Sequence, residues 1–320
     1  MGLILPSSNQ NILELIEQHF APQSSIKSCY LILNIMKSKR LISKLCTTAA
    51  ILTITLLPFS IVKSRDGDSL TLMWQVHPYS DIEELAELSA MGVTLVQSFS
   101  FFQSTQFQID SFLSVAQKEG IGVIPFVGVF IEHSNDLCKL SEVGKDTLKK
   151  LSLNDTIYAW HTFDEPFFDK NATASCQLQI YEELKNLTPN IPVMISYNNS
   201  NRIHYLRNFT ADAVDIVDLH KYSNPYPGKK QGELLNIAKS KFDFSQKTLI
   251  VTLRAFNSFG NSHEPVTDDS MLAEYKYLFG ENSLTNNMGF YGWHLSPNIG
   301  IKKLPHVRRQ FEAIMKERMR

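Results

Sequence analysis

Trp160-His161-Thr162-Phe163-Asp164-Glu165-Pro166 stands near the middle of the chain, directly after the β-rich run 156–159. An apolar strand that ends in two acids and a proline has a definite physical meaning. The strand carries the two carboxylates to the edge of a sheet, and Pro166 ends the pairing because it has no N–H to donate. In barrels of alternating strands and helices, that edge carries the functional residues. The stretch therefore predicts one strand of such a barrel.

β-Rich runs alternate with helical patterns from Ser69 onward, with short connections. The runs cover residues 70–74, 93–98, 122–127, 156–163, 192–197, 214–219, 248–253 and 288–293. Helices are expected from about residue 80 and over 109–118, 145–151, 176–187, 202–209, 232–240, 268–279 and 307–316. Strands covered on both faces read as nearly continuous apolar runs, and about 250 residues is the usual size of a (β/α)8 barrel. The expected fold is α/β, a single (β/α)8 TIM barrel over residues 69–320.

Turn and cap residues bear on this architecture. An open doubly wound sheet is the alternative, but no glycine-rich phosphate turn follows the first strand. Ser80-Asp81-Ile82-Glu83 is expected to be a capping box that starts the first helix. Gly120 is expected to end the second helix, because glycine readily adopts the left-handed conformation found there.

The N-terminal region differs from the rest of the chain. Residues 46–62 contain no charge, and basic residues precede them at Lys37, Lys39, Arg40 and Lys44. This apolar run is slightly long for a signal peptide and slightly short for a membrane span of ~20 residues. Residues 36–64 are therefore expected to be a signal peptide or a signal-anchor, and residues 1–35 a tail of unknown role. A buried helix of a soluble protein is the less favoured alternative.

Other features fit a protein that is secreted or extracytoplasmic, anchored at most through residues 46–62. Acceptor tripeptides for N-glycosylation begin at Asn154, Asn171, Asn186, Asn198 and Asn208. Cys138 and Cys176 would pair in an oxidising compartment, and two buried thiols are the alternative. The chain is 43% hydrophobic with a net charge of −1, and the predicted barrel has no basic run. This composition gives no support for nucleic-acid binding.

Side chains at the C-terminal strand ends of such a barrel point into one shared cleft. Here they are rich in aromatic rings, amides, histidines and carboxylates, and they include Gln75, His77, Ser98, Phe130, Glu132, Asn257 and His294. Sugars bind through C–H faces laid on aromatic rings and through hydrogen bonds from such groups. The expected partner is therefore a carbohydrate, bound by Trp74, Gln97, Tyr197, Asn198, His220, Tyr222, Arg254 and Trp293. The two tryptophans are alternatively core residues.

Asp164 and Glu165 are the candidates for chemistry. A general acid must be protonated near neutral pH, and partial burial among aromatic rings raises a carboxyl pKa as required. Neighbours on a strand face opposite sides, so at most one of the two points straight into the cleft. We expect Glu165 to be the proton donor and Asp164 to assist it. The structural alternative is that one acid caps the next helix or pairs with an arginine.

These residues also carry a resemblance. Residues 69–314 resemble a glycoside-hydrolase-type barrel of the large clan whose acid lies at the end of strand four. The branch concerned has a Trp-x-x-x-Asp-Glu-Pro signature, which residues 160–166 match, and residues 222–227, 253–256 and 265–267 resemble its weaker segments. The resemblance implies a glycoside hydrolase that acts on a glycan or polysaccharide. No cofactor or metal is expected, because His77, His161, His220 and His294 come from different strands without ligand spacing.

The chain departs from that branch in two places. Retaining members of the clan have a nucleophilic glutamate at the end of strand seven, where this chain has Arg254-Ala255-Phe256-Asn257, with Arg254 in place of an expected glutamine. Related sequences often have an aspartate where this chain has His220-Lys221. Glu264 or Asp218 could supply the second carboxylate. An acetamido sugar could instead assist its own cleavage, with Asp164 orienting it. If catalysis is lost, the chain is a carbohydrate-binding barrel.

Overall fold

The computed structural model describes residues 69–134, 137–166, 172–198, 210–221, 240, 242–257, 266–267, 269–280, 283, 285–295 and 299–319. Several predictions lie outside these residues: the N-terminal tail, the signal or anchor segment, and the helices expected over 202–209 and most of 232–240. None of the helices within the described ranges is both long and apolar enough to cross a membrane.

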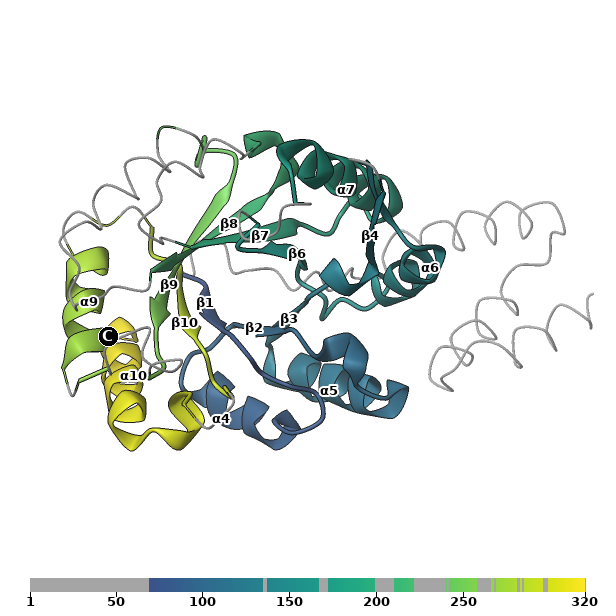
Figure 1. The fold of residues 1–320 in the computed structure, drawn as a ribbon. Helices are drawn as coiled ribbons and strands as arrows, with labels where there is room; N and C mark the ends of the chain where they lie inside the picture. Colours follow the sequence, from purple (N-terminus) through teal and green to yellow (C-terminus); the bar gives the residue numbers. More distant parts are fainter. Residues whose placement is uncertain are drawn as a thin grey trace, which may run out of the picture. The chain divides into compact units, whose positions relative to one another are not determined.

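Parallel strands form an 8-stranded sheet. They are β1 (Thr71–Met73), β2 (Leu95–Ser98), β3 (Gly122–Pro125), β6 (Trp160–Asp164), β7 (Val193–Asn198), β8 (Ile216–Lys221), β9 (Thr248–Arg254) and β10 (Met288–Tyr291). Their order is β3-β2-β1-β10-β9-β8-β7-β6. The two ends of this order also meet, because Val123 bridges Ile157 and Phe126 bridges His161. The sheet is a barrel whose successive strands are neighbours, so the predicted (β/α)8 architecture is confirmed (Figure 1).

Helices alternate with the strands and lie around the outside of the barrel (Figure 1). They are α4 (Leu85–Ala90), α5 (Gln106–Glu119), α6 (Glu142–Leu151), α7 (Ala174–Leu187), α9 (Ser270–Phe279) and α10 (Pro305–Arg318). Short 3₁₀ turns are η1 (Ile82–Glu84), η2 (Phe101–Gln103), η3 (Gly128–Phe130), η5 (Ala211–Ala213) and η6 (Ile301–Lys303). Gly120 ends α5 with a φ of 69°, as predicted. Thr105 starts the same helix through a capping box with Gln108.

An antiparallel hairpin that the sequence did not predict follows β3. Its strands are β4 (Ile131–Ser134) and β5 (Leu137–Leu140). A disulfide joins Cys138 of β5 to Cys176 of α7, so pairing is the alternative that these cysteines adopt. Glu132 was expected on the active rim. It lies instead on this hairpin, half exposed, with its carboxylate 3.3 Å from Lys139 Nζ.

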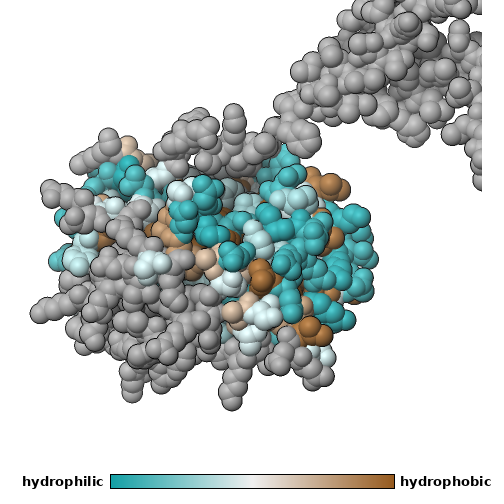
Figure 2. All heavy atoms as spheres, turned by 90° about the horizontal axis from the view of Figure 1, so that it is seen from above, coloured by the Kyte–Doolittle hydropathy of each residue, from teal (hydrophilic) through white to brown (hydrophobic). Residues whose placement is uncertain are grey.

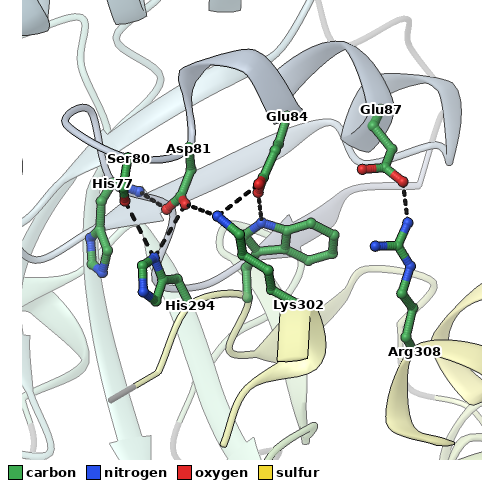
Figure 3. Close-up of polar contacts among 9 residues, drawn as sticks. His77, Ser80, Asp81, Glu84, Glu87, His294, Lys302 and Arg308 are labelled. Carbon is green, nitrogen blue, oxygen red and sulfur yellow. Dashed lines mark hydrogen bonds and ion pairs between the residues drawn. The ribbon is translucent and has the colours of Figure 1, made fainter. Parts of the chain in front are cut away.

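The predicted capping box after β1 is wrong, because neither Ser80 nor Asp81 caps η1 with its side chain. The Asp81 carboxylate is fully buried and accepts a hydrogen bond from the backbone N–H of His77 at 2.8 Å. It also lies 2.9 Å from Lys302 Nζ and 3.2 Å from His294 Nδ1 (Figure 3). Since Lys302 belongs to η6 and His294 follows β10, these contacts join the first strand–helix unit to the last.

The barrel interior changes from apolar to polar along its axis. Its apolar cluster consists of Leu70, Leu72, Trp74, Leu95, Ile124, Ala159, Met194, Ile216 and Ile250. Alternate residues of a strand point to the same face, so the residues two positions further along also point inward. Many of these are buried and polar: Gln97, His161, Ser196, Asp218 and Thr252. Polar groups therefore gather toward the C-terminal ends of the strands, where the sequence placed the site.

The described surface is mainly hydrophilic on the face seen in Figure 2, with hydrophobic residues in small separate groups. Exposed large hydrophobic side chains come from many different elements: Tyr79, Phe107, Val129, Leu137, Val143, Leu153, Tyr277 and Met319. Scattered residues of this kind are normal on a folded protein. The interior polar cluster is thus the feature of the described residues that calls for a functional explanation.

Candidate active site

Glu165 stands at the C-terminal end of β6 in an uncommon backbone conformation. Its φ is 49°, in the left-handed region that few residues other than glycine adopt. The backbone N–H still donates to the Ser196 carbonyl at 2.9 Å, so the residue extends the sheet. The Glu165 side chain is 19% exposed, and its Oε1 lies 3.5 Å from His220 Nδ1. Strained residues of this kind cluster at functional sites, and this carboxylate is neither sealed in the barrel nor directed wholly to solvent.

His220 is fully buried on β8 and lies between two carboxylates. Its Nε2 is 2.8 Å from Asp218 Oδ2, while its Nδ1 faces Glu165. Burial alone would lower the pKa of His220. The Asp218 charge and the hydrogen bonds to Asp218 and Glu165 outweigh burial and raise this pKa to about 10. His220 is therefore an imidazolium at neutral pH, enclosed among acidic groups.

Thr252 of β9 completes this chain of polar groups at its buried end. Its hydroxyl donates to Asp218 Oδ1 at 2.6 Å. The facing residue on β10 is Gly289, which pairs with Thr252 in register. A Cβ atom at position 289 would lie 2.0 Å from Thr252 Oγ1, so only glycine leaves room for the hydroxyl here.

Asp164 differs from Glu165 in its surroundings. Burial raises the pKa of Asp164 most strongly, the His220 charge opposes this, and the charges of Glu165 and Asp218 add to it, which brings the pKa to about 7. Its Oδ1 is buried and has no hydrogen-bond partner in the described part of the chain. Asp164 is consequently a carboxyl group that still holds a proton near neutral pH.

Trp74 lies beneath this cluster as a packing residue. It is fully buried, and its ring meets the edges of His220 and His161 at centroid distances of 4.6 and 5.1 Å. Tyr291 packs against the same indole, and its hydroxyl accepts a hydrogen bond from Gln75 Nε2 at 3.2 Å. Gln75 has a φ of 61°, so a second residue at the strand ends is left-handed. Trp74 offers no exposed ring face, which argues against its expected role as a sugar platform.

His161 is fully buried, and its ring meets Trp74 edge to face. Burial is the main cause that lowers its pKa, the nearby His220 charge adds to this, and the pKa falls to about 3. Its Nδ1 lies 3.1 Å from Gln97 Nε2, and its Nε2 lies 3.1 Å from both the Ser196 hydroxyl and the Phe163 carbonyl. The expected binding residue Gln97 thus serves a buried hydrogen-bond network.

The structure separates two other expected binding residues from this cluster. Tyr197 lies on the outer face of β7, in the core between barrel and helices, where its ring is 5.9 Å from Phe242. Trp293 is also fully buried; its indole N–H donates to Glu84, and the Arg308 guanidinium lies over its ring, 5.6 Å from the centroid. Both side chains are buried in the packing of the fold, and their role as sugar contacts stays a prediction.

The remaining predicted residues are placed only in part. Arg254 is fully buried at the end of β9, with its guanidinium 6.0 Å from the Phe256 ring centroid. Asn198 lies on β7 beside His220 of β8 in the strand register, but its side chain, Tyr222 and Glu264 lie outside the described residues. Asn257 accepts a hydrogen bond from the Val266 backbone N–H, so it holds a loop.

Sequence reasoning missed Ser196, Thr252 and Tyr291 as parts of the site. Ser196 and Thr252 stand two residues beyond the inward apolar residues Met194 and Ile250, and Tyr291 packs against the same apolar cluster. The signal that could have found them is the alternation of strand faces, once one inward residue of each strand is known.

Within the described residues, two clusters bring together ligand types that metals prefer. His77, Asp81 and His294 form one, and His133, Cys138 and Cys176 the other, with candidate ligand atoms within 4.8 Å of one another in each. In the first cluster, the Lys302 ammonium already neutralises Asp81. In the second, the two sulfurs are bonded to each other.

No family model matches the chain. A comparison with curated proteins finds no match either. Solved structures do share the fold. A GH2 beta-galacturonidase from Eisenbergiella tayi bound to galacturonate aligns with a TM-score of 0.51 at 13% identity over 78% of this chain and 51% of that one. A family 39 glycoside hydrolase from Bacteroides cellulosilyticus WH2 aligns with a TM-score of 0.50 at 14% identity over 77% of this chain and 63% of that one. At such identities the likeness shows a common barrel fold, and the chain spans about half to two thirds of these proteins' lengths.

Proposed function

We propose that this barrel hydrolyses a glycosidic bond in a glycan or polysaccharide, with Glu165 as the proton donor. The observation that carries the proposal is the position of Glu165. It is a partly exposed carboxyl group in a left-handed conformation at the end of β6, beside a second carboxyl group. Active sites of (β/α)8 barrels lie at this end of the strands. The shared fold with two glycoside hydrolases agrees with the proposal.

Asp164 is the group that assists Glu165 in this proposal. Asp218 is fully buried, and its two carboxylate oxygens face Thr252 and His220, so it is not available to a substrate. Asp164 has a carboxylate oxygen without a described partner. This arrangement supports the route in which an acetamido sugar assists its own cleavage, with Asp164 orienting the acetamide and Glu165 protonating the leaving oxygen.

The test is a panel of glycosides and polysaccharides that includes N-acetylhexosamine substrates. Wild type, Glu165→Gln and Glu132→Gln are assayed for release of reducing sugar. Glu132 is the matched control, because it is an exposed acid on the β4–β5 hairpin that pairs only with Lys139 among its described ion pairs. We expect wild type and the control to release product and Glu165→Gln to lose roughly 10²- to 10⁴-fold in rate. Equal activity of all three proteins would remove Glu165 from the mechanism.

A second candidate function is carbohydrate binding without turnover. The observation that favours it is His220, whose ring occupies the space between Glu165 and Asp218, where an inverting hydrolase would hold water. The described end of β9 also carries Arg254 where a nucleophilic acid would stand. Calorimetric binding of an oligosaccharide that the wild type leaves intact would favour this alternative over hydrolysis.

A further inference from the structure

We infer that Thr252, Asp218 and His220 form a buried series of polar and charged contacts that positions the Glu165 carboxylate at the barrel mouth. His220 is then a positioning residue for Glu165, and Thr252 and Asp218 fix the ring of His220. The inference rests on the proposed function, since it gives that same carboxyl group its geometry. It assigns a role to three residues that come from two strands other than that of Glu165.

The contacts follow one another from the buried Thr252 to the partly exposed Glu165 carboxylate. Thr252 Oγ1 donates to Asp218 Oδ1 at 2.6 Å, and Asp218 Oδ2 lies 2.8 Å from His220 Nε2. His220 Nδ1 then faces Glu165 Oε1 at 3.5 Å. Asp218 and His220 are fully buried, whereas the Glu165 side chain is 19% exposed. Of the residues in this series of contacts, Glu165, the proposed proton donor, is therefore the one that reaches the surface.

A contribution to stability alone does not explain the buried contacts among Thr252, Asp218 and His220. A buried ion pair is often no more stabilising than apolar side chains of similar volume, because both charges lose their hydration. The lower part of the same barrel is filled with such apolar side chains. A fixed imidazole beside a strained carboxylate, by contrast, restricts the rotamers that Glu165 can adopt, and accurate placement of a catalytic group has large effects on rate.

The charges around His220 come from several strands. Asp218 faces it from β8, and Glu165 and Asp164 face it from the end of β6. His161 of β6 is held neutral near it, and the Tyr291 ring of β10 meets it at a centroid distance of 5.2 Å. The raised pKa of His220, about 10, agrees with an imidazolium that donates to a carboxylate on each side. Asp218 is the nearer of the two, so it dominates this charge state.

The first experiment measures the imidazole of His220 directly and requires no activity. In ¹⁵N NMR spectra of the full chain, both ring nitrogens of His220 are expected to stay protonated through neutral pH and to titrate near pH 10. In Asp218→Asn the pKa of His220 should fall to near the ordinary histidine value of about 6.5, so that the ring is neutral above that pH. A neutral His220 at pH 7 in the wild type would overturn the inference, whatever the enzyme does.

The second experiment separates positioning from folding by steady-state kinetics. Thr252→Val removes the hydroxyl at nearly constant shape, and Thr252→Ser retains it. We expect kcat to fall roughly 10- to 100-fold in His220→Gln and by a smaller factor in Thr252→Val, with KM nearly unchanged and with recovery in Thr252→Ser. His161→Gln is the control, because His161 is equally buried beside Trp74 but has no described contact with Glu165.

The outcomes distinguish this inference from the proposed function. If the wild type cleaves no glycoside while the NMR result is as expected, the proposed function fails, but the arrangement of Thr252, Asp218 and His220 stands as described. If the wild type cleaves a glycoside and Thr252→Val, His220→Gln and His161→Gln change kcat equally, the positioning role is wrong.

Discussion

Folding raises the pKa of Asp164, so its carboxyl group is more often protonated and uncharged than in the unfolded chain. Its pKa is about 7 in the folded protein, mainly because of burial, against about 3.9 for an aspartate in an unfolded chain. Between these values the folded state keeps a proton that the unfolded state has released. Asp164 therefore makes the protein less stable as pH rises from about 4 to 7, and its effect is constant above that range.

Asp164→Asn tests this linkage, because asparagine keeps the shape and does not ionise. We expect the variant to exceed the wild type in free energy of unfolding by on the order of 4 kcal/mol at about pH 8, and to match it near pH 4. Urea denaturation at both pH values is the measurement. The same difference at both pH values would show that ionisation of Asp164 is not responsible.

At this scale the sequence predicted what is local and missed what depends on strand facing. Asp164 and Glu165 lie together in one motif, so their position at a strand end could be read directly. Tyr197 is predicted to contact the sugar, but its neighbour Ser196 is the residue that faces inward. Because β7 is apolar on both faces, its pattern does not reveal which residues point inward. The partnership of His220 with Asp218 and Thr252 depends on pairing between strands, which no local pattern encodes.

At the scale of elements, the junction around Asp81 joins the beginning of the barrel to its end. Asp81 is fully buried, and Lys302 Nζ lies 2.9 Å from its carboxylate and 2.7 Å from that of Glu84. Removing one partner of a buried ion pair leaves an uncompensated charge, which costs more than the pair itself contributes.

Lys302→Met should lower the free energy of unfolding by about 3 kcal/mol, because it removes the ammonium group that lies 2.9 Å from the buried Asp81 carboxylate. Lys303→Met is the control, since Lys303 is an exposed neighbour in the same turn. It should change stability by less than about 0.5 kcal/mol. Denaturation midpoints of the two variants give the comparison, and equal midpoints would mean that the junction contributes little.

Elements with strong patterns were predicted well, and short polar ones were not. The long helices α5, α7 and α10 lie where apolar periodicity and end signals such as Gly120 placed them. The β4–β5 hairpin was missed because its strands are short and carry exposed polar residues such as Glu132. The capping box at Ser80 failed because the Asp81 carboxylate makes contacts far along the chain, which override its local preference.

At the scale of the whole molecule, the repetition of strand and helix over residues 69–320 was sufficient to predict a barrel. Each unit could be read separately, and closure follows from the number of units and from short connections. The N-terminal 68 residues lie outside the structural description, so the signal peptide or anchor over 36–64 stays a prediction, as does the secreted or extracytoplasmic location.

Intact mass and N-terminal sequencing of the protein, expressed in a secreting host, would test that prediction. A cleaved signal gives a mature protein that begins after the apolar run 46–62 and appears in the medium. An uncleaved anchor gives a full-length protein in the membrane fraction. Recovery of the full-length chain in the soluble cytosolic fraction would contradict both forms of the prediction.

The central claim, that Glu165 donates a proton to the departing oxygen, is tested most directly by the dependence of rate on the leaving group. Glu165→Gln and wild type are compared on glycosides of one sugar, with leaving groups from acidic nitrophenols to simple alcohols. We predict that Glu165→Gln loses roughly 10²- to 10⁴-fold on the alcohols and less than about tenfold on the nitrophenols, which leave without protonation. An equal loss across the whole series, or no loss at all, would contradict the claim.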